Sequence, residues 1–180
     1  MWKEFKPAIR FVLIFVGLYF TGNLVYGFYI SLHGNTPDAV TKLVSEQSAW
    51  FLTHVFGYEV NAVSNATGPT VFLKTGEYNV LNVFEGCNGI NVFIVFTAFI
   101  VAFNGNLRKL LWYVPFGILI LYASNLLRIV FLYWTAVTYH RYFYYVHKYI
   151  FTGAIYGVVF ILWIIWVYQL NDRKKTIAAE

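Results

Sequence analysis

The chain has 180 residues, of which 59% are hydrophobic, 22% aromatic and 12% charged, and its formal net charge is +5. The charged fraction is about half of the roughly 25% that is typical of soluble domains, which excludes a soluble domain of this length and predicts an integral membrane protein. In membrane proteins Lys and Arg collect on the cytoplasmic side, so the basic balance does not indicate nucleic-acid binding.

The first apolar run, 11–30, is long enough to cross a bilayer as a helix. Three cations precede it, Lys3, Lys6 and Arg10, so its N-terminus is expected in the cytoplasm. The run is too long for a signal peptide and lacks a clear small-residue cleavage site, so we expect it to remain as the first transmembrane helix.

Residues 31–86 lack the long apolar runs that occur in the rest of the chain. The order Thr36-Pro37-Asp38 predicts a helix that begins with Thr36 as its N-cap and ends near Gly57. Its apolar residues, rich in Trp and Phe, fall largely on one face. Such a helix either lies in the membrane interface or packs on a small domain of its own.

Three short β-type runs follow this helix, separated by glycine-containing turns: 58–63, 71–74 and 78–84. Acidic residues outnumber lysines in 31–86, which suits a location outside the cell. We therefore expect a small extracytoplasmic α+β insertion at 31–86.

Three further apolar runs predict spans at 88–103, 110–135 and 149–168. The first is short, about 24 Å at 1.5 Å per residue. The aromatic residues of 136–148 are typical of a belt at the outer membrane interface. Eight of the 13 Lys and Arg residues lie in segments that this arrangement places inside: Lys3, Lys6, Arg10, Arg108, Lys109, Arg173, Lys174 and Lys175.

The sequence thus predicts an all-α membrane protein of one domain, 1–180, with four transmembrane helices and an extracytoplasmic α+β insertion between the first two. Both termini are expected in the cytoplasm. The protein is expected in the plasma (inner) membrane, where it contacts the lipid bilayer.

Cys87 is the only cysteine, which excludes an internal disulfide and a multi-cysteine metal site. It lies where the second predicted span begins, in the stretch Glu85-Gly86-Cys87-Asn88-Gly89, and the glycines let a backbone or a substrate come close. A helix N-terminus and a nearby cation would lower the pKa of this thiol and make it a nucleophile. The alternative is an inert packing residue.

Arg128 lies 18 residues past Leu110 and so rises roughly 27 Å from the inner end of its helix, to the outer rim. An ionised side chain within an apolar run is costly and indicates function. Asn125 and Ser124 share its helix face and are placed to steady the guanidinium. The alternative is a snorkelling arginine that binds a lipid phosphate.

His147 stands just before the last predicted span, on the same outer rim as Cys87 and Arg128. Its pKa range suits a general base, a role for which His140 competes. The four histidines show no zinc-site spacing, so neither a metal nor another cofactor is expected.

The patterns Glu85-x-Cys87-x-Gly89 and Asn125-x-x-Arg128, followed by His147 at a helix start, resemble in this order the motifs of the exosortase/archaeosortase family. Each motif alone is weak evidence for the family, whereas the three in this order are specific to it. The last predicted helix completes the match. The short chain resembles the compact single-core members from Bacteroidetes-type bacteria, the F-type exosortases.

The resemblance implies a membrane cysteine transpeptidase or protease whose active site is on the extracytoplasmic face. Its substrates would be exported proteins that end in a short motif, an apolar helix and a basic tail, and an unknown acceptor nucleophile would take the new C-terminus from a thioester. Cys87 would be the nucleophile, Arg128 would bind the oxyanion and His147 would act as base and then acid, with Glu85, Gly89 and Asn125 in support. Glu85 either orients His147, accepts a substrate amide, or is a solvated acid.

Two alternatives stay open at this point. A cysteine-dependent acyltransferase or simple protease shares the nucleophile and differs only in the acceptor. A non-enzymatic membrane scaffold or lipid-binding subunit would use Arg128 to hold a lipid headgroup and Cys87 as a small core residue.

Overall fold

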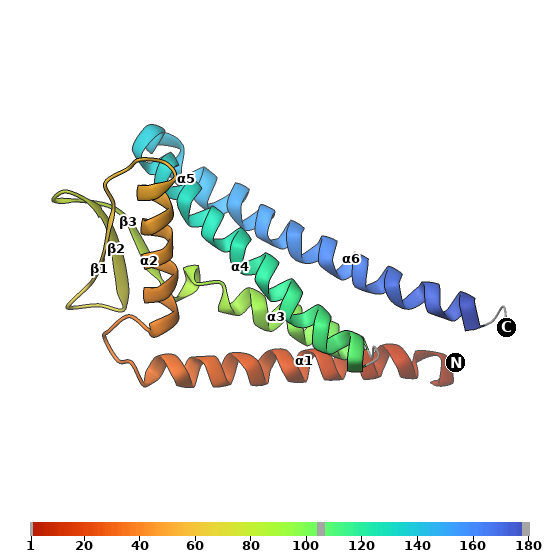
Figure 1. Ribbon diagram of the computed structural model, residues 1–180. Helices are drawn as coiled ribbons and strands as arrows, with labels where there is room; N and C mark the ends of the chain where they lie inside the picture. Colours follow the sequence, from red (N-terminus) through yellow and green to blue (C-terminus); the bar gives the residue numbers. More distant parts are fainter. Residues whose placement is uncertain (1, 104–106, 178–180) are drawn as a thin grey trace.

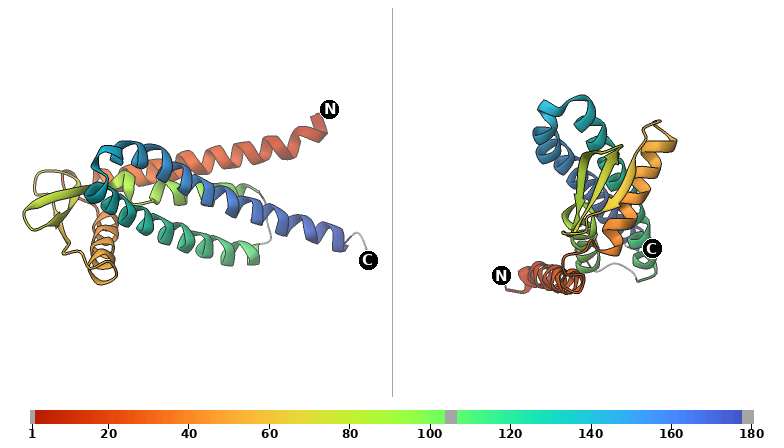
Figure 2. Two further views of the ribbon diagram at one scale, coloured as in Figure 1. Left: turned by 90° about the horizontal axis from the view of Figure 1, so that it is seen from above. Right: turned by 90° about the vertical axis from the view of Figure 1, so that its left-hand side faces the viewer.

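The computed structural model describes residues 2–103 and 107–177, with side chains at 5–103 and 107–168. Three long helices and one short one form a bundle (Figure 1), and the start of the first and the end of the last lie at the end of the bundle remote from a small sheet (Figure 2). We call the other end, which carries the sheet, the sheet end. The four helices are α1 (Trp2–Ser31), α3 (Ile90–Ala102), α4 (Leu107–Thr138) and α6 (Thr152–Ile177).

Three helical stretches of the described chain are long and apolar enough to cross a membrane: Phe5–Ser31, Leu107–Thr138 and His140–Tyr168. They contain the spans predicted at 11–30, 110–135 and 149–168, and they are longer because the helices continue beyond the apolar runs. The span predicted at 88–103 corresponds to α3, whose 13 residues rise about 20 Å, less than the roughly 30 Å of a hydrocarbon core. The structure therefore supports three spans by length, and a fourth only as a short helix.

Some of the predicted topology falls outside the described parts of the chain. A tight polar loop is predicted at 104–109: residues 104–106 lie outside the described chain, whereas 107–109 belong to a helix that begins at Leu107. The side chains of Lys3 and of the basic tail at 173–175 also lie outside the described parts.

The segment between α1 and α3 folds into the helix α2 (Ala39–His54) and an antiparallel sheet in the order β1-β2-β3. Asp38 is the N-cap of α2, because its carboxylate accepts hydrogen bonds from the backbone N–H groups of Val40 and Thr41. The prediction of Thr36 as N-cap is wrong, since its hydroxyl donates to the His33 carbonyl at 2.8 Å. The strands are β1 (Asn61–Ser64), β2 (Thr70–Thr75) and β3 (Tyr78–Phe84).

The buried face of α2 carries only some of its large apolar residues. Val44 and Leu52 are buried together with the small hydroxyl residues Ser45 and Ser48, while Trp50 is exposed. Ser45 and Ser48 donate to carbonyls one turn earlier in α2, at 2.7 Å each, so burial leaves no hydroxyl unsatisfied.

Two apolar clusters hold the molecule together. One joins α3, α4 and α6 and includes Phe96, which packs so closely on Gly117 that a Cβ there would lie 2.2 Å from the ring. The other joins α2, the sheet and α4 at the sheet end, and Tyr133 of α4 is hydrogen-bonded to the Thr75 hydroxyl of β2 within this region. Cys87 belongs to the second cluster, at the junction between the spanning helices and the sheet.

Candidate functional site

The candidate nucleophile lies in a tight turn between β3 and α3. Glu85–Cys87 form one turn of 3-10 helix (η1), and Gly89 then caps α3 with φ +87. This left-handed conformation favours glycine. A Cβ at position 89 would also lie 3.3 Å from Cγ of Asn125, so a side chain here would be strained and would press on α4. We call residues 85–89 the Cys87 turn.

Asn125 connects the Cys87 turn to α4. Its side chain is buried, and Nδ2 donates to the Cys87 carbonyl oxygen at 2.9 Å. Its Oδ1 accepts a long hydrogen bond of 3.5 Å from Nη1 of Arg128. Asn125 thus contacts Arg128 as predicted, whereas Ser124 donates to the Ile120 carbonyl of its own helix.

The electrostatics of Cys87 are set by burial and by Arg128. Cys87 is only 5% exposed, and burial raises the pKa of its thiol, while the Arg128 guanidinium lowers that pKa and the Glu85 carboxylate raises it, with a net rise. The prediction of a thiol with a lowered pKa is therefore wrong. Arg128 is the cation that offsets part of the cost of ionising the Cys87 thiol.

His147 lies in a π-helical turn, η3 (Val146–Phe151), just before α6. It is half-buried and stacks on Phe143, with 5.9 Å between ring centroids. The charge of Arg128 acts on the imidazole as well as on the Cys87 thiol, so the guanidinium lies within electrostatic reach of both groups. His140 is exposed, in the short 3-10 turn η2 (His140–Tyr142), and within the described chain no contact ties it to Cys87 or Arg128.

Glu85 is half-buried and acts on Cys87 through its charge. Its backbone carbonyl accepts a 3.4 Å hydrogen bond from Tyr26. Among the described residues its carboxylate has no hydrogen bond or ion pair, so no contact supports the alternative in which Glu85 orients His147.

A buried polar network beside Cys87 was missed by the sequence analysis. Asn88 is 0% exposed, and its Nδ2 donates to the Tyr26 hydroxyl at 2.8 Å and to Oγ1 of Thr41 at 3.1 Å. Its Oδ1 accepts from the Ile90 backbone N–H at 3.0 Å, and the Thr41 hydroxyl donates to the Asp38 carboxylate. The network ties α1, α2 and the start of α3 to the Cys87 turn. The one sequence signal was an Asn-Gly pair at the start of an apolar helix.

Replacing Asn88 with alanine should destabilise the folded protein by about 2 kcal/mol, because buried partners lose their hydrogen bonds. We expect a lower midpoint of thermal unfolding in detergent micelles. Asn79→Ala is the control, since Asn79 is exposed on β3. Equal midpoints for the two variants would contradict the structural role of Asn88.

The raised pKa of Cys87 predicts a particular pH profile for its alkylation. Because the thiolate is the reacting form, alkylation by iodoacetamide should be slow at neutral pH and accelerate only above the ordinary titration range of cysteine, near 8.5. Arg128→Gln removes the charge that lowers the pKa, so the profile should move further to alkaline pH. A profile centred at or below the ordinary range, or unchanged in Arg128→Gln, would contradict this electrostatic arrangement.

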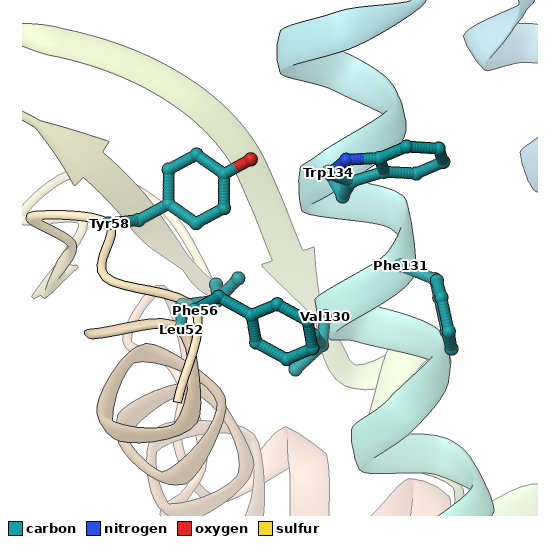
Figure 3. A pocket seen from close by; sticks show the side chains of 6 residues that line it. All are labelled: Leu52, Phe56, Tyr58, Val130, Phe131 and Trp134. Carbon is teal, nitrogen blue, oxygen red and sulfur yellow. The ribbon is translucent and has the colours of Figure 1, made fainter. Parts of the chain in front are cut away.

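An apolar cavity of about 180 Å³ opens between the end of α2 and α4. In Figure 3 the Phe56 ring reaches from the end of α2 toward Val130 on α4. Cys87, Arg128 and His147 do not line the cavity, so it is distinct from the candidate site. Its lining residues are Leu52, Phe56, Tyr58, Val130, Phe131 and Trp134. Within the described chain, no group of three His, Cys, Asp or Glu side chains is placed to hold a metal ion.

The long apolar helices define a mostly helical integral membrane protein. The family model of the transmembrane exosortases (Exosortase_EpsH) matches residues 7–169, and the chain belongs to this family. This confirms the family predicted from the motifs around Cys87, Arg128 and His147. No curated protein and no solved structure matches the chain.

Proposed function

We propose that the protein is a membrane cysteine transpeptidase or protease that cleaves a C-terminal sorting signal from exported proteins and passes the new C-terminus to an acceptor. The observation that carries the proposal is the position of Arg128, which acts electrostatically on both Cys87 and His147 although the three residues come from three separate elements. Membership in the exosortase family supports a role as a membrane transpeptidase.

The proposed topology has four spans, with the short α3 as the second, and places the sheet end outside the plasma (inner) membrane. It is supported by the start of α1 and the end of α6, which lie at the same end of the bundle, remote from the sheet (Figure 1). The cations predicted inside belong to that end. Exported substrates would thus meet Cys87 at the extracytoplasmic face.

In the first proposed step, His147 accepts the proton of the Cys87 thiol and Sγ attacks the scissile carbonyl carbon. Arg128 stabilises the negative charge that develops on the carbonyl oxygen. The C–N bond then breaks, the amine leaves with the proton held by His147, and a thioester joins Sγ to the new C-terminus.

In the second step, an acceptor nucleophile gives its proton to His147 and attacks the thioester carbonyl. The C–S bond breaks, the product leaves joined to the acceptor, and Cys87 regains its proton. Water in place of the acceptor gives simple proteolysis by the same steps. Asn125 and Gly89 support the reaction by holding the Cys87 turn against α4.

A purely lipid-binding subunit fits these contacts less well, because Arg128 is directed to Asn125 and to the Cys87 thiol instead of standing apart as a headgroup ligand. The test is to compare the C-terminal peptides of exported proteins by mass spectrometry in host cells with and without this chain. We expect proteins that end in an apolar helix and a basic tail to keep that tail only where the chain is absent. Identical C-termini in both cell types would overturn the proposal.

A further inference from the structure

Helix α2 lies across the bundle at the sheet end. Figure 1 shows the sheet on one side of α2 and the spanning helices extending from its other side. On that other side, Oε1 of Gln47 accepts a hydrogen bond of 2.6 Å from the Tyr122 hydroxyl of α4. Tyr122 lies within the candidate span Leu107–Thr138, 16 residues before its end, which is about 24 Å along the helix. The face of α2 that carries Gln47 therefore points toward the part of α4 that would lie inside the bilayer.

The same face of α2 carries exposed apolar residues. Leu43, Gln47 and Trp50 follow one another at spacings of four and three, so they lie on one side of the helix. Leu43 is 48% exposed and Trp50 55% exposed, and Phe51 beside them is exposed too. No other element of the described chain covers these side chains. The buried residues of α2, among them Val44 and Leu52, lie away from Leu43 and Trp50 and pack with the sheet and with the later turns of α4.

We propose that α2 is an in-plane membrane helix whose Leu43, Trp50 and Phe51 side chains insert into the lipid at the sheet end of the bundle. Lipid is the occupant that fits, because the face points toward the spanning helices of a chain that is itself embedded in a bilayer. Exposed charged Glu46 flanks the face, as expected for an amphipathic helix at the boundary between acyl chains and headgroups.

Exposed apolar residues also lie on both sides of the cavity between the end of α2 and α4. Phe56, just after α2, and Phe131 and Trp134 of α4 are all exposed around the cavity of Figure 3. Exposed apolar residues on two neighbouring elements mark a contact with a membrane or a partner. This inference does not depend on the proposed peptidase chemistry.

The test measures the depth of single fluorescent probes in the full-length protein. In a Cys87→Ser background, Leu43→Cys and Trp50→Cys are labelled with a nitrobenzoxadiazole maleimide and reconstituted into phosphatidylcholine–phosphatidylglycerol vesicles. The matched control is Tyr78→Cys, because Tyr78 is an aromatic residue at the β2–β3 turn and 81% exposed. At Leu43 and Trp50 we expect blue-shifted emission and quenching by nitroxide lipids at least about twofold stronger than at Tyr78.

Quenching of the Leu43 and Trp50 probes by aqueous iodide, to the degree seen at Tyr78, would overturn the proposal. Shielding from both quenchers would overturn it as well, because it would mean that a second protein chain covers the face. Thermal unfolding midpoints matched to the Cys87→Ser parent show that each variant is folded, and Phe51→Cys replaces any variant that is not.

Discussion

Replacing Cys87 with alanine is expected to abolish C-terminal processing while the folded protein remains in the membrane. Loss of an enzyme nucleophile lowers turnover by about 10⁴-fold or more, because no other group can form the covalent intermediate. The measurement is the ratio of tail-bearing to processed C-terminal peptides in cells that express the variant. We expect only the tail-bearing form.

The substitution should cost little stability, since it removes one sulfur atom from the core and leaves a small cavity, worth about 1 kcal/mol. Abundance in the membrane fraction therefore stays near that of the unsubstituted protein. The control is Ser124→Ala, which removes a nearby hydroxyl on α4 that is bonded only within its own helix. Normal processing by Cys87→Ala would refute a cysteine mechanism, whatever the behaviour of the other residues.

The electrostatic effect of Arg128 on both Cys87 and His147 is consistent with the predicted gathering of these residues at one end of the bundle. Apolar runs of measurable length fix which helix ends meet, and a single arginine within such a run is conspicuous. The contact between Asn125 and Arg128 followed from their spacing on one helix. These predictions depended on local periodicity and on length, both of which a sequence displays directly.

Features that depend on packing between distant segments were not predictable. The pKa of Cys87 is raised because side chains from α2, the sheet and α4 surround the thiol, and no pattern near residue 87 shows this. Asn88 finds its partners Thr41 and Tyr26 across 47 and 62 residues of chain. The sequence left the surroundings of the apolar face of α2 open for a related reason, because large apolar residues suit a core and a bilayer equally well.

The short helix α3 shows why the count of spans was harder to predict than their positions. An apolar run of 16 residues, 88–103, meets the composition of a span, yet Asn88 and Gly89 at its start belong to the Cys87 turn and not to the helix. A helix of 13 residues can complete a bundle where the bilayer or its neighbours adjust to it. It also brings the Cys87 turn close to the apolar layer, level with Asn125 of α4.

Replacing Arg128 with glutamine is expected to lower turnover by about 10²- to 10³-fold, the usual loss when one group that stabilises an oxyanion is removed. Glutamine still offers an N–H donor but no charge, and the variant also loses the cation that favours ionised Cys87. Arg128→Lys keeps a point charge without the planar donor fork, so we expect an intermediate rate. The assay uses vesicles that contain the protein and a substrate identified from the C-terminal peptides.

Whether the Arg128→Gln substitution changes kcat or KM distinguishes a role of Arg128 in stabilising the oxyanion from a role as a lipid anchor. A group that acts on the developing oxyanion lowers kcat with little change in KM, whereas a residue that only positions the protein on lipid changes neither once the protein is folded in the vesicle. The alkylation profile of Cys87 in the same variants gives an independent reading, because it reports the effect of the charge on the thiol without any substrate. An Arg128→Gln variant with normal kcat and an unshifted profile would remove Arg128 from the site and leave it as a ligand for lipid phosphate.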